Sequence, residues 1–305
     1  LDFVAGLYYF TEDFQAYEAM QYKLAMCEIA LISLSPAIYN SCVANSNAQA
    51  FNADFEQSVD SYAAYGQATF ALASSLDLVL GARWTRDEKS AHFWQAPNFL
   101  AGTLNAATED TLLGFDGDRF TYRAGLNWRP TEDLLVFGSY STGYKSGGFN
   151  SQSAARNIGQ GRIVDPETVE NIELGFRSDW FERLLRVNLT LYHMEISDFQ
   201  DRSYDGVSYS LQNAGDIRSQ GAEFEVSLRP NSDLRLYVSG AYLDSEFTDY
   251  TGASNLPGLP GTVDITGTRP QFATEWTGSV GLEYESEIEG TDLSFAFRSD
   301  LAFSS

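Results

Sequence analysis

The most telling absence in this chain of 305 residues is a long apolar run. A membrane-spanning helix needs about 20 consecutive apolar residues, and no stretch reaches that length. The longest candidate, residues 24–38, is interrupted by Glu28, Ser33, Ser35 and Pro36. Acidic residues and a strand-like segment precede it, which also excludes a signal peptide at this position. If the chain enters a membrane, it must do so as strands that close into a barrel, because lipid offers no partner for free backbone amides.

Basic residues are also scarce. Lys and Arg number 19 against 42 Asp and Glu, so the formal net charge is -23 at pH 7. A nucleic-acid-binding protein needs a basic surface, and this composition excludes that class of partner.

Cysteine and histidine, the usual soft ligands and nucleophiles, occur only twice each. Cys27 and Cys42 share one long polar connection, where a disulfide that closes the loop is the favoured interpretation and two unpaired thiols the alternative. His92 and His193 are far from them and from each other in the sequence, which argues against a metal site. No serine lies in the sequence context of a nucleophile. We therefore expect no catalytic residue, no metal and no cofactor, and predict that the protein is not an enzyme.

A two-residue alternation of apolar and polar side chains is what the sequence has in abundance. Residues 120–128 illustrate it: the even positions carry Phe120, Tyr122, Leu126 and Trp128, with polar or small residues between them. Successive side chains of a strand point to opposite faces, so each such segment has one apolar and one polar face.

Eleven segments show this pattern, and their connections alternate between short and long. Short turns rich in Pro, Gly, Asn, Asp and Ser contrast with five long connections, at 11–60, 90–118, 145–166, 197–210 and 248–270. A transmembrane β-barrel has short periplasmic turns and long extracellular loops, whereas a soluble sandwich has no reason for this order. The fold class predicted is therefore all-β, an antiparallel transmembrane barrel. The expected strands cover residues 2–10, 61–73, 77–89, 119–129, 133–144, 167–179, 184–196, 211–228, 233–247, 271–285 and 291–303.

The number of strands suggests that the barrel is larger than this chain. Bacterial single-chain barrels have an even number of strands, and open sheet edges are not tolerated in lipid. The chain also begins and stops within strand-like segments. We therefore expect residues 1–305 to form part of one barrel domain whose closing strands lie outside the sequence.

Three motifs identify a family. Residues 143–150 (GYKSGGFN) end one strand, residues 166–176 (PETVENIELGF) open the next, and residues 213–225 (NAGDIRSQGAEFE) enter a third. In this order and spacing the chain resembles the C-terminal barrel portion of TonB-dependent outer-membrane receptors. The resemblance implies a bacterial outer-membrane location, a barrel of about 22 strands and an N-terminal plug. It also implies energy coupling through the TonB complex, by an N-terminal region that is absent here, and uptake of a siderophore or similar solute.

The motifs themselves have physical roles. Gly143, Gly147 and Gly148 are expected to permit a sharp exit into a loop, and Pro166 suits the first position of a strand. Glu173 and Glu223 fall on polar faces, so we expect them in the lumen with charges that brace the barrel or hold a plug. The arginines predicted on the same faces are Arg83, Arg123, Arg177, Arg186, Arg235 and Arg298.

Solute binding is expected on the long loops and the upper lumen. Aromatic groups with a neighbouring cation could hold a chelate, although packing among the loops explains the same residues. The candidates are His92, Phe93, Trp94, Phe99, Tyr144, Lys145, Phe149, Tyr204 and Tyr209. A ferric siderophore is the favoured solute, with cobalamin, heme or an oligosaccharide as alternatives. A passive porin and a surface adhesin remain the rival functions.

Overall fold

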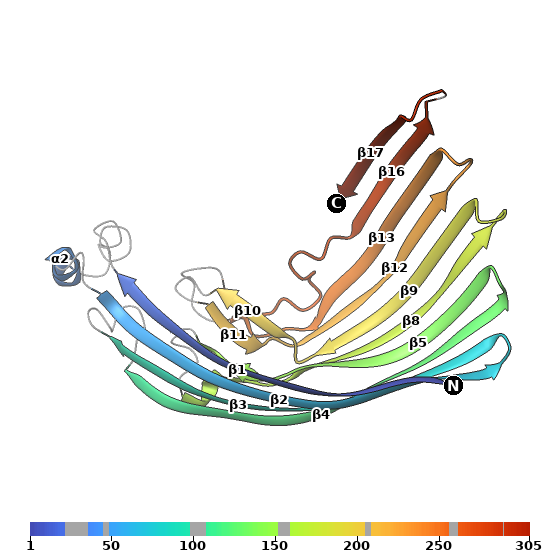
Figure 1. Ribbon diagram of the computed structural model, residues 1–305. Helices are drawn as coiled ribbons and strands as arrows, with labels where there is room; N and C mark the ends of the chain where they lie inside the picture. Colours follow the sequence, from blue (N-terminus) through green and yellow to red (C-terminus); the bar gives the residue numbers. More distant parts are fainter. Residues whose placement is uncertain are drawn as a thin grey trace.

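The computed structural model describes residues 1–21, 36–44, 49–97, 108–151, 159–204, 209–255, 262–288 and 290–305. Its main feature is one antiparallel sheet of eleven strands that curves into an open trough (Figure 1). Neighbours in the chain are neighbours in the sheet, in the order β1-β2-β3-β4-β5-β8-β9-β12-β13-β16-β17. Within the described residues β1 and β17 stand at the two ends of this order and do not pair with each other.

The eleven strands differ greatly in length. The long ones come first, at β1 (Asp2–Gln21), β2 (Gln49–Ala73), β3 (Leu76–Pro97) and β4 (Glu109–Thr131). The rest are shorter: β5 (Leu134–Lys145), β8 (Glu167–Trp180), β9 (Leu185–Ser197), β12 (Asp216–Leu228), β13 (Leu234–Asp249), β16 (Trp276–Glu287) and β17 (Ser294–Ser304).

Small elements lie in the long connections. Three short hairpins are formed by β6 (Gly148–Phe149) with β7 (Ile163–Val164), β10 (Gln200–Tyr204) with β11 (Tyr209–Asn213), and β14 (Ala253–Ser254) with β15 (Thr262–Val263). A 3₁₀ helix, η2 (Gly159–Arg162), precedes β7, and one α-helix, α2 (Pro36–Ala44), lies between β1 and β2. Within the described residues no helix has the length and the apolar character needed to span a membrane.

The count of eleven strands and the short turns between them are confirmed. The lengths of the first four strands were predicted wrongly. β1 continues to Gln21, β2 starts at Gln49, β3 runs to Pro97 and β4 starts at Glu109, so much of the expected loops 11–60 and 90–118 is strand. These extensions project far beyond the end of β5 (Figure 1). The expected strand at 211–228 is instead two elements, β11 and β12.

The convex face of the sheet carries an apolar belt. On β4 the residues Phe120, Tyr122, Leu126 and Trp128 all point outward and are exposed. Exposed apolar residues continue the belt on other strands of the sheet, for example Leu174 on β8, Leu191 on β9 and Val280 on β16. From Phe120 to Trp128 the strand advances about 27 Å, enough for a tilted strand to cross the roughly 25 Å apolar band of an outer-membrane barrel. The prediction that the apolar faces turn outward is confirmed.

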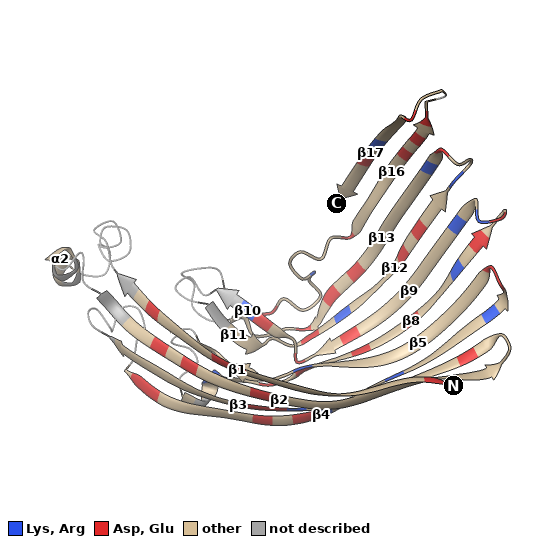
Figure 2. Cartoon of the chain, viewed as in Figure 1, with Lys and Arg blue, Asp and Glu red and all other residues tan. Residues whose placement is uncertain are grey.

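Above the belt the two faces of the long strands exchange their character. Pairing of β3 with β4 runs without a register shift from Leu76–Trp128 to Gln95–Glu109, so odd and even positions keep their sides. On the convex side Asp110, Asp116 and Asp118 replace the aromatic residues, and red bands mark these projecting strands in Figure 2. On the concave side apolar residues are buried, as described next. The projection therefore has the polarity of a water-soluble sheet, and the belt has that of a membrane protein.

Candidate functional site: the concave wall and its loop roots

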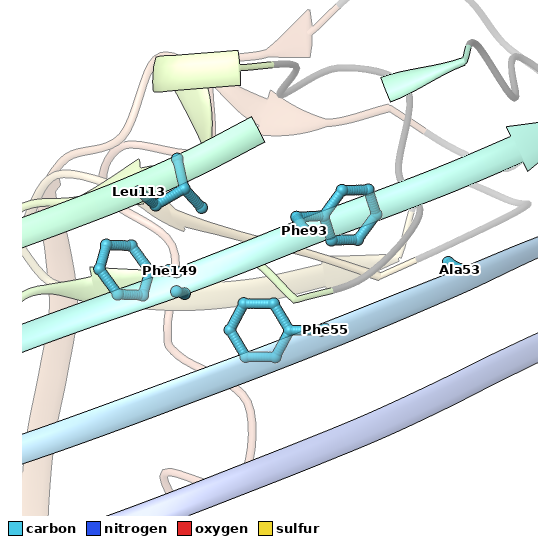
Figure 3. Close-up of a cluster of buried hydrophobic side chains, with 6 residues drawn as sticks. Ala53, Phe55, Phe93, Leu113 and Phe149 are labelled. Atoms are coloured by element: carbon cyan, nitrogen blue, oxygen red, sulfur yellow. The ribbon is translucent and has the colours of Figure 1, made fainter. Parts of the chain in front are cut away.

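The concave side of the projection is covered by the chain that follows β5. Ala53 and Phe55 of β2, Ala91 and Phe93 of β3, and Leu113 of β4 form a buried cluster with Phe149 of β6 (Figure 3). Phe115 and Ile163 pack against it. Apolar burial of this kind stabilises the docked loop, so residues around β6 and β7 are held against the inner wall.

A buried ion pair fastens the same loop. Arg162 of η2 is fully buried, and its Nε and Nη2 donate to the two carboxylate oxygens of Glu109 at 2.8 and 2.7 Å. The guanidinium also lies 3.4 Å from the centroid of the Phe93 ring, and its Nη1 donates to the carbonyl of Asn150 at 3.0 Å. Burial alone would raise the pKa of Glu109, but hydrogen bonds from Arg162 and from the Gly159 amide outweigh it and lower this pKa. Glu109 and Arg162 are thus a fully ionised, fully satisfied pair.

The three sequence motifs meet at the roots of the loops. Glu167, from the second motif, is nearly buried and accepts a hydrogen bond from the backbone amide of Gln200 at 2.9 Å. Lys145, from the first motif, lies 3.4 Å from the same carboxylate oxygen. The amide Nε2 of Gln200 donates to the carbonyl oxygens of Ser146 and Asp165 at 3.1 and 2.9 Å. One glutamine therefore ties the exit of β5 to the entrance of β8.

The third motif joins through Asn213. Its side-chain oxygen accepts the amide of Asp165, and its Nδ2 donates to the carbonyls of Asp165 and Asp198, all between 2.8 and 2.9 Å. We call the group of Lys145, Asp165, Glu167, Gln200 and Asn213 the loop-root clamp. Its polar groups are paired with one another, so its first role is to hold the roots of the β5–β8 and β9–β12 connections together.

Two motif glycines are required by close approach. A Cβ on Gly147 would lie 2.4 Å from the Phe115 ring and 2.6 Å from the carbonyl oxygen of Val164. Gly215 has φ +120, and a Cβ there would meet the Asp249 carbonyl at 1.8 Å. At Gly215 φ also lies in the left-handed region that favours glycine, whereas at Gly147 it is the close approach of Phe115 and Val164 that requires glycine.

A second part of the concave wall carries exposed aromatic rings beside a cation. The guanidinium of Arg83 lies 5.3 Å from the centroid of Tyr8 and 5.9 Å from that of Tyr65, and its Nε donates to Thr85 at 2.9 Å. We call Tyr8, Tyr65 and Arg83 the aromatic–arginine patch. A flat, partly hydrated cation between two rings can contact an anionic, aromatic ligand.

The lower concave wall is a charged hollow of about 1010 Å³ near the short turns. Arg186 donates to both carboxylate oxygens of Asp179, at 2.8 and 3.1 Å, and Asn188 donates to Glu225 at 3.0 Å. Arg177 and Glu223 also line the hollow. Its walls are polar and carry both signs of charge.

The predicted solute-binding residues do not form one site. His92, Phe93 and Trp94 lie in β3, not in a loop. Phe93 and Phe149 meet in the buried cluster, whereas His92 pairs with Asp110 at 2.7 Å on the convex face, which Trp94 shares. Successive side chains of a strand point to opposite faces. This separation was not expected here, because these residues were predicted to lie in a loop.

The other candidates have separate places. Tyr144 and Lys145 end β5, and Lys145 belongs to the loop-root clamp. Tyr204 and Tyr209 face each other in the β10–β11 backbone register. Phe99 and Cys27 fall outside the described residues, and the side chain of Cys42 in α2 does too, so the disulfide stays a prediction.

The lumenal candidates lie on the concave face, with other partners than expected. Arg186 pairs with Asp179, Arg298 with Glu283 and Asp300, and Arg235 with Glu283 at 3.6 Å. Arg177 lies 5.8 Å from the Phe137 ring centroid. Glu173 accepts from Asn171 at 3.0 Å. In the described ranges neither Glu173 nor Glu223 forms an ion pair with an arginine, and Arg123 simply shares this face.

The residues that sequence reasoning missed had weak or hidden signals. Tyr8 stands in a run of three aromatic residues, Tyr8 to Phe10, which obscures the alternation. Arg162 and Glu109 lay inside expected loops. Across the ranges that the structure describes, no three His, Cys, Asp or Glu side chains gather in a way that could hold a metal ion.

Comparison with known proteins decides the family. The family model "TonB dependent receptor-like, beta-barrel" matches residues 13–303. The chain belongs to the TonB-dependent receptor β-barrel family. A TonB-dependent receptor barrel of this kind lies in the bacterial outer membrane, and the family comprises receptors and transporters.

Among similar proteins is the probable TonB-dependent siderophore receptor PiuA of Acinetobacter baumannii, 24% identical over 258 residues. The match covers 78% of this chain and 33% of PiuA. The ferric-pyoverdine M114 receptor PbuA of Pseudomonas sp. is 26% identical over 201 residues, which is 64% of this chain and 22% of PbuA. This TonB-dependent receptor chain thus spans about a third or less of these relatives.

The solved structure of the ferric yersiniabactin uptake receptor FyuA from Yersinia pestis has the same fold. It superposes with a TM-score of 0.70 at 18% identity, over 99% of this chain and 39% of that one. At this identity the likeness concerns the fold alone.

Proposed function

We propose that this TonB-dependent receptor takes up a scarce, bulky solute actively across the outer membrane, and that the solute is a ferric siderophore. The observation that carries the proposal is the aromatic–arginine patch, a half-buried cation between two exposed rings on the inner wall of a family barrel. Ferric siderophores are bulky, and many carry aromatic or anionic groups. Of the similar proteins, PiuA is described as a probable TonB-dependent siderophore receptor and PbuA as a ferric-pyoverdine receptor.

Energy coupling belongs to the same proposal. The charged hollow is a polar wall that a folded plug could contact through hydrogen bonds and ion pairs, with Arg177, Arg186 and Glu223 among the contacts. We expect such a plug, and the segment that binds TonB, in a longer protein of which residues 1–305 form part of the barrel.

The test is uptake of radioactive iron by a strain that lacks its own siderophore receptors and expresses the full-length protein. We expect uptake of at least one ferric siderophore, and none in the matching strain without TonB. Uptake that continues without TonB would favour a porin. If only cobalamin, heme or an oligosaccharide is taken up, the proposal of active uptake stands and the proposed solute, a ferric siderophore, is wrong.

Single substitutions then locate the solute. Arg83→Ala should weaken binding about tenfold or more, since it removes a charge-assisted contact. Trp94→Ala is the control. Trp94 is an exposed aromatic residue of the same strand, β3, but it lies on the convex face, away from the inner wall. Equal affinities of the two variants would remove Arg83 from the binding site.

A further inference from the structure

The convex, membrane-facing side of the sheet is not uniformly smooth. A groove of about 430 Å³ crosses β5, β8 and β9 near their periplasmic ends. It is bounded almost wholly by apolar side chains, namely Leu134, Val136, Leu174, Phe176, Leu189 and Leu191. These residues lie in adjacent rows of the sheet, because Val136 pairs with Phe176 and Phe176 with Leu189.

The periplasmic end of the groove is closed by Trp180. Its indole Nε1 donates to Ser178 Oγ at 2.9 Å, and Ser178 Oγ donates to the carbonyl of Val187 at 2.9 Å. Ser178 is only 4% exposed although it lies on the membrane-facing side. Both polar groups are satisfied internally, so an apolar chain in the groove leaves no buried donor or acceptor unpaired.

Two arginines stand just beyond this end. Arg183 belongs to the turn between β8 and β9, and Arg229 to the turn between β12 and β13. The Arg229 amide donates to the carbonyl of Leu184 at 2.7 Å, which places the two turns side by side. Both side chains are exposed, and neither forms a salt bridge among the described residues, although Arg183 is close enough to Asp179 to interact electrostatically with that carboxylate.

The opposite end of the same strands carries mostly carboxylates, whereas the turns carry both signs of charge, with Glu182 beside Arg183 and Asp233 four residues after Arg229. Above the belt the convex face of β8, β9 and β13 presents Glu170, Glu195, Asp244 and Glu246, against Arg218. A lipid phosphate is therefore repelled there, and at the turns the exposed arginines Arg183 and Arg229 are the groups that would bind it. The geometry points to a phospholipid of the periplasmic leaflet: we propose that one acyl chain fills the groove and that Arg183 and Arg229 bind its phosphate.

The site requires only the outer-membrane location, and it is independent of the solute. Arginine forms paired hydrogen bonds with phosphate, and an acyl chain contributes about 0.8 kcal/mol for each buried methylene. A bound phospholipid would therefore stay with the receptor through mild detergent extraction, whereas lipid on the smooth belt would exchange.

The experiment is native mass spectrometry of the full-length receptor extracted in mild detergent, followed by titration with phosphatidylglycerol. We expect one retained phospholipid per receptor, reduced at least fivefold by Val136→Phe, which fills the groove, and by the double change Arg183→Ala with Arg229→Ala. The matched controls are Val238→Phe, on the convex face of β13 outside the groove, and Arg235→Ala, which faces the lumen.

Three results would overturn the proposal. They are equal lipid retention in Val136→Phe and Val238→Phe, unchanged retention when Arg183 and Arg229 are both replaced, or retention of lipopolysaccharide in place of phospholipid. Folding is checked by resistance of the purified variants to unfolding in cold SDS, and a variant that fails it is replaced by Leu189→Trp, which fills the same groove.

Discussion

The lower and the upper half of β4 belong to one uninterrupted strand, but they place apolar residues on opposite faces. Between Phe120 and Trp128 the even positions are apolar and meet lipid. Between Glu109 and Asp118 the even positions are mostly acidic, and Leu113 of the opposite side is buried under Phe149. Since the register does not shift, only the surroundings change. A membrane strand that continues into water must therefore exchange its polarity, and a covering loop must bury the new apolar face.

The largest expected effect comes from removing the cation that holds this covering loop. Arg162→Ala leaves the Glu109 carboxylate buried without its partner, which costs about 3–5 kcal/mol. Since the loop can open locally, we expect the amides of residues 146–151 and 159–166 to exchange a hundredfold faster or more, while the belt keeps its protection. Hydrogen exchange of the full-length receptor measures both. Unchanged exchange at the Asn150 amide, which donates to Arg162, would contradict the proposed fastening.

The belt itself is tested by one charge placed at two heights on the same face. Leu126→Arg should destabilise the barrel by about 2–4 kcal/mol, because the charge faces hydrocarbon. Asp116→Arg, also on the even side of β4, faces water and should cost about 1 kcal/mol or less, chiefly through the lost ion pair with Arg86. Denaturant unfolding in lipid vesicles compares them. Similar losses at both sites would mean that the boundary does not lie near Phe120.

A smaller effect is expected from acid. The pKa of Glu109 is lowered from its ordinary value of 4.5 in the folded state. The ionised form is therefore the stabilising one: its contribution is complete above pH 4.5 and disappears as the pH falls through the lowered pKa. Pepsin cleavage of the loop should increase in this acidic range. Glu109→Gln is the control, and a pH step that persists in this variant would assign the titration to another group.

The smallest effect should come from the convex surface of the projection. Arg86 pairs with Glu88 at 2.8 Å and with Asp116 at 2.7 Å, but all three side chains are well exposed. We expect Arg86→Ala to change the free energy of unfolding by less than about 1 kcal/mol, and less still at high salt. A salt titration of the unfolding midpoint checks this, and a loss as large as that of Arg162→Ala would abolish the distinction between the two arginines.

Sequence reasoning was reliable where the alternation of apolar and polar residues reflects a single arrangement, with apolar side chains outward and polar side chains inward. The eleven strands, their outward apolar face and the concave position of Glu173 and Arg186 follow from a period of two. It failed where the apolar positions change from one face of the strand to the other, as between Leu113 and Phe120. A strand that passes from lipid into water has no single alternating pattern, so its upper part looked like a loop. Arg162 and Gln200 could not be found either, since their partners lie 53 and 33 residues away along the chain, at Glu109 and Glu167.

The loop-root clamp has a consequence for how such receptors can vary. Lys145 and Glu167 flank the connection between β5 and β8, and Gln200 and Asn213 belong to the connection between β9 and β12, yet they share polar contacts. Loop tips grafted from another receptor should be accepted when the transplanted segments begin and end outside these residues. A graft that replaces the roots of one connection alone would leave orphaned donors in the other. The loop-root clamp is thus a shared base for these loops. The part that can be exchanged between receptors is the tip of a loop, not the whole loop.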